Sequence, residues 1–424
     1  VIHSRTDIRR HYTSPSSESD QAIAFRRRII AIAVLGTLNL AVVEASTSTT
    51  GRRSLDLTYQ HGLDVDTLAK SIEEAQSPNV DISHSMLGDE VSYKLFKKCL
   101  DACDDLESFA SAANGLTHRT ATRILERLLT ASLQKLDLSW NNLEIHGSAA
   151  KLFHEALLEL LQSPSGCPTT LILDRCSLGP ADCRAMGKGI IQRFSEDRNA
   201  TASCISLSLC GNPAMGDSGM AAIAATLRST ANHPVLDRLD LSGCNIGDAG
   251  AEALAMAIDS WQCCVVKHLD LSNNKISHRG AESLARSLGD ARRRMKDSIV
   301  MESLDLSNNP VGDLGMEALS LHAFRAVPSF TLRSCGIQAD GAACVGDGLR
   351  ELLNAAERPN FSIDLSGNPF GILRAKLKSG GKASRLKSKA SETAASYVNQ
   401  GIGFIKKGLK DVGVDIGAAE DSDD

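Results

Sequence analysis

The sequence predicts an α/β solenoid, in which strand–turn–helix units stack into a curved array with a concave face. Two observations predict it. Residues 239–254 and 269–284 superpose position for position, as Leu-Asp-Leu-Ser, a polar turn, Gly-Ala-Glu and a final Leu. A fixed period of about 30 residues is typical of solenoids. Aromatic residues make up only 4% of the chain, which fits a core of small, repeated aliphatic side chains.

The residue types explain each part of the unit. Leu-x-Leu alternation places two aliphatic side chains on one face of a short strand and the residue between them on the other face. The Asn or Cys three places later stands where the chain leaves the strand, and a buried polar group there can bond the backbone of two neighbouring turns. Gly250 and Gly280 then lead into Ala/Leu runs with helical spacing. One unit cannot bury its apolar face alone, whereas stacked units can.

About eleven units follow one another over residues 54–377, and the first three are degenerate. Their turn residues are 25 to 36 positions apart by subtraction, and the longer spacings come from polar inserts after the helices. Gln60 and Ser85 take the turn position in the first two units. The structural ladder predicted at the turns then consists of Asn114, Asn141, Cys176, Asn212, Cys244, Asn274, Asn309, Cys335 and Asn368.

Side chains between and beside the strand leucines are predicted to face the concave side. Adjacent parallel strands lie about 4.8 Å apart, so Asp240, Asp270 and Asp305 should form a row of carboxylates that repel one another unless a basic group covers them. We therefore expect a protein partner with a basic patch. The alternative is that these carboxylates bond local groups, or the neighbouring Arg238 and His268. The expected partner-binding residues are Lys135, Asp137, Trp140, Arg238, Asp240, His268, Asp270, Asp305, Arg333 and Asp364.

Trp140 follows the strand of the first strong repeat, at the rim of the concave face. Exposed Trp is a favoured anchor in protein interfaces. The competing interpretation is that Trp140 covers the degenerate repeats before it.

The frame LxLSxNxIxxxGAxxLA, with Asn and Cys sharing the turn position, resembles leucine-rich repeats of the ribonuclease-inhibitor type. Ran GTPase-activating proteins and NOD-like receptors carry similar repeats. The resemblance covers roughly residues 54–375, with irregular repeat lengths and weak N-terminal copies. It implies a horseshoe, with a parallel sheet on the concave face and helices on the convex face, whose concave face binds a protein without catalysis. The alternatives it implies are a GTPase activator of the Ran-directed type and an immune-type sensor.

The segment before the repeats predicts a targeting signal. Residues 1–28 are polar and Ser-rich, which predicts a disordered leader. Residues 29–45, an apolar run behind three arginines with a small-residue end, are typical of a secretory signal. An uncleaved membrane anchor is the second interpretation, because the run is shorter than the roughly 20 residues of a spanning helix. A cap on the first repeat is the third. Residues 46–53 are expected to be a linker.

These features predict the secretory pathway or a membrane as the location. The cytoplasm is the alternative, because the repeat subtype and the turn thiols suit a reducing compartment. The chain starts at Val1 and its first Met is Met86, which predicts a fragment or a misassigned start.

The composition changes again after the repeats. Residues 378–392 are expected to be a basic Gly/Ser/Lys linker, residues 393–417 an amphipathic helical segment, and residues 418–424 an acidic tail. Apolar residues three and four positions apart define the helical stripe. The stripe is expected to cap the last repeat, to lie on an anionic membrane or to dock on a partner.

The sequence predicts no enzyme, cofactor or metal. The eleven His residues are scattered and the twelve cysteines contain no Cys-x-x-Cys, so Cys176, Cys244 and Cys335 are interpreted as buried structural thiols. The small net charge of −5 argues against general nucleic-acid affinity. Asn199 and Asn360 stand in Asn-x-Ser/Thr sequons and are candidate glycan acceptors. The oligomeric state is left open between a monomer and an unknown oligomer.

Overall fold

The computed structural model describes residues 44–47, 53–60, 64–144, 149–163, 166–196, 204–231, 235–296, 298–354, 361–369, 374–377 and 414–415. The chain divides into two units, Val1–Val43 and Glu44–Asp424, and every described residue belongs to the second. The predicted leader, basic linker and acidic tail lie outside the described residues, as do residues 29–43 of the apolar segment, Asn199, Asn360 and nearly all of residues 393–417. Within the described part, no helix has the length and apolar character that a membrane crossing requires.

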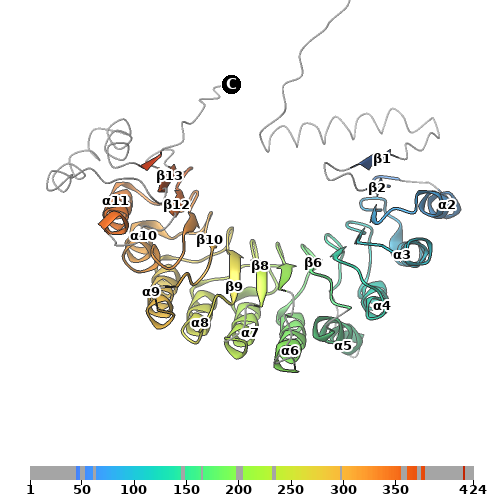
Figure 1. The fold of residues 1–424 in the computed structure, drawn as a ribbon, viewed down its shortest axis with the longest axis horizontal. Helices are drawn as coiled ribbons and strands as arrows, with labels where there is room; N and C mark the ends of the chain where they lie inside the picture. The colour runs from blue at the N-terminus through green and yellow to red at the C-terminus, as the bar shows by residue number, and fades with distance from the viewer. Residues whose placement is uncertain are drawn as a thin grey trace, which may run out of the picture. The chain divides into compact units, whose positions relative to one another are not determined.

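The strands of the described residues form one open sheet in chain order. From β2 to β12 every neighbouring pair is parallel. These strands line the concave side of the unit (Figure 1). They are β2 (Arg53–Asp56), β3 (Asn79–Asp81), β4 (Ser108–Ala110), β5 (Lys135–Asp137), β6 (Thr170–Ile172), β7 (Ile205–Ser208), β8 (Leu236–Asp240), β9 (Val266–Asp270), β10 (Ser303–Asp305), β11 (Ser329–Thr331) and β12 (Phe361–Asp364).

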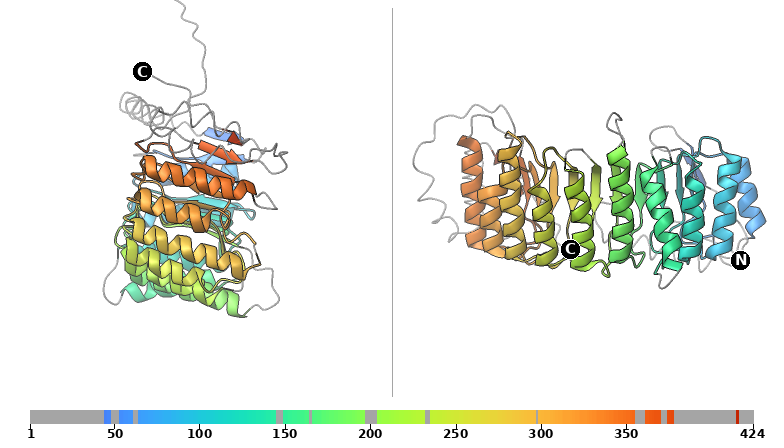
Figure 2. Two further views of the ribbon diagram at one scale, coloured as in Figure 1. Left: turned by 90° about the vertical axis from the view of Figure 1, so that its left-hand side faces the viewer. Right: turned by 90° about the horizontal axis from the view of Figure 1, so that it is seen from below.

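Helices cover the opposite, convex side and lie next to one another in chain order (Figure 2). One helical segment follows each strand from β2 to β11, and a π-helical turn, η1, extends α10. The helices are α2 (Val65–Ala75), α3 (Gly88–Ala102), α4 (His118–Leu128), α5 (Ala149–Gln162), α6 (Pro180–Glu196), α7 (Gly216–Ser229), α8 (Asp248–Ile258), α9 (His278–Arg294), α10 (Gly312–Ala318), η1 (Leu319–Ala323) and α11 (Ala339–Asn354).

Antiparallel strands extend the sheet at both ends. β1 (Glu44–Thr47) pairs with β2, where the targeting segment was expected to end and a linker to begin. β13 (Arg374–Leu377) pairs with β12, and β14 (Val414–Asp415) pairs with β13. β14 lies inside residues 393–417, for which the sequence predicts a helix. At these two residues backbone pairing with the sheet takes the place of the helix.

The core lies between the sheet and the helices. In each of the eleven parallel strands, one residue points to the helices and is at most 3% exposed. These residues are Leu55, Val80, Phe109, Leu136, Leu171, Leu207, Leu239, Leu269, Leu304, Phe330 and Ile363. Strand pairing places each of them beside the next, so the core is continuous from repeat to repeat. The predicted α/β solenoid is confirmed.

The turn residues join neighbouring repeats through hydrogen bonds. Asn274 is representative: its Oδ1 accepts from the backbone N–H of Ile246 at 2.9 Å, and its Nδ2 donates to the carbonyl oxygens of Leu241 and Leu271, each at 2.9 Å. Ile246 and Leu241 belong to the preceding repeat. The amide can satisfy both a donor and acceptors because it carries both functions. Asn114, Asn141, Asn212, Asn309 and Asn368 make the same kind of bonds.

A cysteine at the turn position makes the donor bond of the asparagine amide but not its acceptor bond. The thiol of Cys244 donates to the carbonyl oxygen of Leu209 at 3.1 Å, and Cys176 and Cys335 make the equivalent bond. A thiol offers no strong acceptor for the backbone N–H groups that an Asn would bind. Burial raises the pKa of each of these three thiols to about 12, so they stay protonated at physiological pH. All twelve cysteines are free thiols.

A second ladder, of aspartates at helix starts, was not predicted from the sequence. Asp248 in the first turn of α8 accepts from the N–H of Ser277 at 2.8 Å, the Ser277 hydroxyl at 2.6 Å and the N–H of Gly280 at 3.1 Å. It therefore caps α9 from the preceding repeat. A Cβ at Gly280 would lie 2.8 Å from the Asp248 carboxylate, so only glycine leaves room for this contact. Asp217 binds Gly250 in the same way.

Candidate partner-binding face

The last residue of each strand from β2 to β12 presents a side chain to the concave face. Strand register places Asp240 beside Asp270, and Asp270 beside Asp305. The three predicted carboxylates therefore lie on neighbouring strands, in a part of the sheet that we call the acidic row (Asp240, Asp270 and Asp305). Each of the three side chains is partly exposed.

Local hydrogen bonds fix each carboxylate of the acidic row. Oδ1 of Asp240 accepts from the backbone N–H of Ser242 at 2.9 Å and from its hydroxyl at 2.7 Å. Oδ1 of Asp270 accepts from the N–H of Ser272 at 2.8 Å, and Asp305 bonds the N–H two residues later in the same way. Among the described residues, the Oδ2 atoms of the row accept no hydrogen bond. Each carboxylate thus uses one oxygen to hold its turn and keeps the other for a ligand.

The two basic residues beside the acidic row do not neutralise it through ion pairs. Arg238 is exposed, and within the described part of the chain it makes no hydrogen bond or ion pair. His268 Nδ1 lies 2.9 Å from the hydroxyl of Ser303, and its Nε2 lies 3.6 Å from a carboxylate oxygen of Glu302. Of the alternative stated for these aspartates, the structure shows the bonds to local groups and not the pairing with Arg238 or His268.

The C-terminal members of the predicted site form an ion pair with each other. Nε of Arg333 on the turn after β11 donates to Oδ2 of Asp364 on β12 at 2.8 Å. Burial acts to raise the pKa of Asp364, but hydrogen bonds from Ser366 and the Arg333 guanidinium outweigh it and hold this pKa below its ordinary value. Asp364 is therefore already paired, unlike the acidic row.

The N-terminal members lie on β5 and the turn that follows it. Lys135 is exposed, and Asp137 accepts from the N–H and hydroxyl of Ser139 at 2.9 and 2.5 Å. Trp140 is 56% exposed and has a φ of 58°, in the left-handed region. That conformation costs an L-residue roughly 1–2 kcal/mol. The guanidinium of Arg175 lies 4.3 Å from the centre of the Trp140 ring, as a cation–π contact.

The structure thus separates the predicted site residues into three groups along the sheet. β6 and β7, which end at Ile172 and Ser208, lie between the β5 group and the acidic row. Arg175 was missed as the neighbour of Trp140. Its signal in the sequence is its position directly before a turn residue, since Trp140 directly precedes Asn141 and Arg175 directly precedes Cys176.

Comparisons with known proteins identify the repeat. Residues 131–144, 232–255, 262–285 and 298–320 match the sequence model of the family described as Leucine Rich repeat. The matched segments contain β5, β8, β9 and β10 with the turns that follow them. The chain is a leucine-rich-repeat protein. Such repeats generally mediate protein–protein interaction. A comparison with curated proteins gives no match.

In this leucine-rich-repeat protein, the surroundings of Asp270, the central member of the acidic row, disfavour the ionised form of its carboxylate. Burial, together with the neighbouring charges of Asp240 and Asp305, raises the pKa of Asp270 above its ordinary value, although bonds from Ser272 oppose this. Burial likewise raises the pKa of Asp174, on the turn after β6. The fold therefore holds Asp270 charged at some cost in stability, which a cation bound over the row would offset.

Opposite effects on stability are expected when Asp270 and Asp364 are each changed to Asn. A raised folded pKa means that Asp270 stabilises the fold when protonated and loses this contribution as pH rises through that pKa. Asp270→Asn should therefore raise the free energy of unfolding at neutral pH, by about 0.5 kcal/mol after solvent screening. The depressed pKa of Asp364 has the reverse sign, so Asp364→Asn should lower stability by about the same amount.

Urea denaturation at neutral and acidic pH measures both changes. The loss from Asp364→Asn should shrink as pH falls below the ordinary aspartate pKa through the lowered folded pKa of Asp364, whereas the gain from Asp270→Asn should shrink at higher pH, as pH falls through the raised folded pKa of Asp270. Changes of the same sign at neutral pH would contradict this electrostatic interpretation of the concave face.

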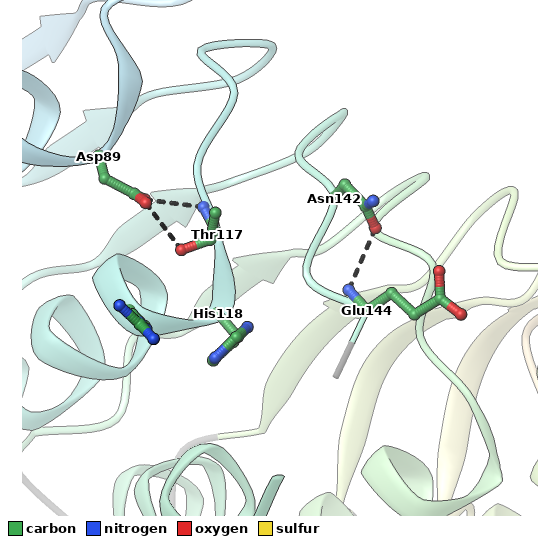
Figure 3. A pocket seen from close by; sticks show the side chains of 6 residues that line it. Asp89, Thr117, His118, Asn142 and Glu144 are labelled. Atoms are coloured by element: carbon green, nitrogen blue, oxygen red, sulfur yellow. Dashed lines mark hydrogen bonds between the residues drawn. The ribbon is translucent and has the colours of Figure 1, made fainter. Parts of the chain in front are cut away.

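A hollow of about 370 Å³ lies at the edge of the repeats that follow β4 and β5 (Figure 3). Asp89 already uses its carboxylate there to cap α4, accepting from the N–H and hydroxyl of Thr117, each at 2.7 Å. Arg119 and Glu144 add one charge of each sign, and His118 also lines the hollow. In the described residues, no group of three or more His, Cys, Asp and Glu side chains is arranged to hold a metal ion.

Proposed function

We propose that this leucine-rich-repeat protein is a non-catalytic binding module that holds a basic segment of a protein partner on its concave face, at the acidic row of β8 to β10. The observation that carries the proposal is the register of Asp240, Asp270 and Asp305 on adjacent strands, each with one oxygen that bonds nothing in the described residues. Lys and Arg side chains are the groups of a protein partner that carry the complementary charge.

Local bonding prepares the acidic row for binding. Because Oδ1 of each aspartate is held by the turn that follows it, the free oxygen has a fixed direction before a partner arrives. Ordering a side chain on binding costs about 0.5–1.5 kcal/mol for each immobilised side chain, and the row avoids much of this. Arg238 stands in the adjacent row of the concave face, where it would repel a partner whose basic groups are out of register.

A lysine peptide serves as the probe for the acidic row. A fluorescent Lys-Gly-Lys-Gly-Lys peptide should bind the full chain with an affinity that falls as salt is added, because salt screens exposed charges. Changing Asp240, Asp270 and Asp305 together to Asn should weaken binding about tenfold at low salt. Three partly exposed pairs at about 0.5 kcal/mol each account for this factor.

The matched control removes three charges from the helices of the same repeats. Glu252→Gln, Glu282→Gln and Glu317→Gln change the net charge by the same amount, but these residues lie on α8, α9 and α10. This variant should keep the affinity of the unmodified chain. Equal losses in the two triple variants, or no loss in either, would show that the concave row does not bind the peptide.

Two finer features of the proposal have indirect support. The alternation of Asn and Cys at the turns, with a helix in each repeat, supports the ribonuclease-inhibitor type of leucine-rich repeat. The described residues add no observation in favour of the GTPase-activating or sensor interpretation. The predicted secretory location rests on residues outside the described part, and sequencing the N-terminus of the mature protein tests it.

A further inference from the structure

One residue in every repeat, directly before the turn residue, adopts a left-handed backbone conformation. Its N–H donates to the carbonyl of the next repeat, as in His84 to Ala112 at 2.7 Å and Ala113 to Ser139 at 2.9 Å. These residues therefore form an ordered row along the rim of the sheet. The row is Tyr59, His84, Ala113, Trp140, Arg175, Gly211, Gly243, Asn273, Asn308, Ser334 and Gly367, with φ between 52° and 75°.

Rings and a guanidinium stack along the N-terminal half of this row. The rings of Tyr59 and His84 are stacked, with centroids 5.0 Å apart and planes 11° apart. Trp140 lies one repeat beyond Ala113, and the guanidinium of Arg175, one repeat further, stacks on the Trp140 ring. A Cβ at Gly211 would lie 2.6 Å from Cγ of Arg175, so the glycine leaves room for the arginine stem. Neighbouring residues thus hold the Trp140 side chain on one face only.

Ala113 leaves a gap between the two stacks. His84 stacks on Tyr59, and on its other side lies the repeat of Ala113. Trp140 contacts Arg175, and on its other side lies the same repeat. His84 and Trp140 are two repeats apart. Because neighbouring strands are about 4.8 Å apart, the two residues are separated by roughly 10 Å. Stacked rings pack with centroids about 4.5–7 Å apart, so this space fits one flat group. Among the described residues, no ring contact joins His84 to Trp140.

Carboxylates lie below this gap on the concave face. Ala110, the last residue of β4, pairs in register with Asp81 on one side and Asp137 on the other. Each of these aspartates uses Oδ1 to bond a serine N–H two residues later, at 2.9 Å. Lys135, two residues before Asp137, is the nearest base on β5 and carries one positive charge. Because Asp81 and Asp137 carry two negative charges, a net negative charge remains. Ala113 lies three residues after Ala110, on the turn that follows β4, so the two residues are at most about 10 Å apart.

We propose that the Ala113 slot, defined by His84, Ala113 and Trp140, receives one aromatic side chain from an extended segment of a protein partner. A Lys or Arg about three residues away in that segment contacts Asp81 and Asp137. The inference rests on the proposed function in that the partner is a protein, but the slot lies on β3 to β5 and shares no residue with the acidic row. It gives the strained, exposed Trp140 a binding role.

A nucleic-acid base is also flat, but charge disfavours it. A strand whose base entered the Ala113 slot would bring phosphates towards Asp81 and Asp137. A basic peptide places the opposite charge there. The observations therefore favour a protein segment over single-stranded nucleic acid.

The test uses the two tryptophan indole N–H signals of the full ¹⁵N-labelled chain, which contains Trp140 and Trp261 alone. Trp261 is fully buried and serves as an internal control. Acetyl-Tyr-Gly-Gly-Arg-amide should shift the Trp140 signal and leave the Trp261 signal in place. Acetyl-Tyr-Gly-Gly-Glu-amide should bind about fivefold more weakly, the factor expected from two exposed charge pairs.

Ala113→Leu should abolish the shift by filling the slot. Ser334→Leu places the same side chain at the same row position of a distant repeat and should leave the shift intact. A Trp140 signal that does not move, or that moves equally in Ala113→Leu, overturns the proposal. A response to an oligothymidylate without a response to the peptide overturns it in favour of nucleic acid. The triple Asn variant of the acidic row should still bind the tyrosine peptide, so the two proposals can fail separately.

Discussion

Asn274→Ala is expected to lower the free energy of unfolding by about 3 kcal/mol, because it leaves two buried backbone groups without a partner. The N–H of Ile246 loses its bond to Oδ1, and the carbonyl of Leu241 loses its bond from Nδ2. The carbonyl of Leu271 stays bonded, because Asn309 also donates to it at 2.8 Å. Urea denaturation followed by far-UV circular dichroism measures the loss.

Cys244→Ala is the matched control at the preceding turn. Its thiol donates to the carbonyl of Leu209, but Nδ2 of Asn212 donates to the same oxygen at 2.8 Å. Removing the thiol therefore leaves no orphaned group and should cost only about 1 kcal/mol of packing. Equal losses at the two turns would show that the amide bonds between repeats are not what holds them together.

Phe324→Ala is expected to cost about 4 kcal/mol, the cost typical of removing a buried aromatic side chain. Phe324 follows η1 and is 2% exposed. Its ring centroid lies 4.7 Å from that of Phe361 and 5.5 Å from that of Phe330. These rings fill the core behind β11 and β12, and Phe330 takes the position that leucine occupies in most other strands. The cavity would weaken the C-terminal end of the parallel sheet.

Leu321→Ala provides the control for Phe324, three residues earlier in the same helical segment. Leu321 is 60% exposed, and surface substitutions usually change stability by less than about 0.5 kcal/mol. Thermal or urea denaturation compares the two variants. Similar losses would contradict the assignment of Phe324 to the core and Leu321 to the surface.

The sequence was sufficient for the sheet because the strand signal is local and repeated. Leu239 and Leu269 occupy the same place in the Leu-x-Leu pattern, so stacking one unit on the next fixes their register. The turn position of Asn274 follows from the same frame. The order of the acidic row followed directly, since Asp240 and Asp270 stand between the two leucines of their strands.

Contacts between repeats could not be predicted in the same way. The bond from Asp248 to Gly280 crosses from one helix start to the next, and the frame alone does not show that a glycine is needed there. The contact of Arg175 with Trp140 depends on the left-handed conformation before each turn, which the hydrophobic pattern does not reveal. At Val414, the apolar stripe predicted a helix because periodicity ignores pairing with a sheet edge.

Carbodiimide coupling of the lysine peptide to the full chain tests the central claim most directly, because it joins an amine only to a carboxylate that it contacts. Mass spectrometry then locates the coupled residues. The account predicts adducts on Asp240, Asp270 and Asp305. Adducts that form as readily on Glu252, Glu282 and Glu317 of the convex helices would contradict it.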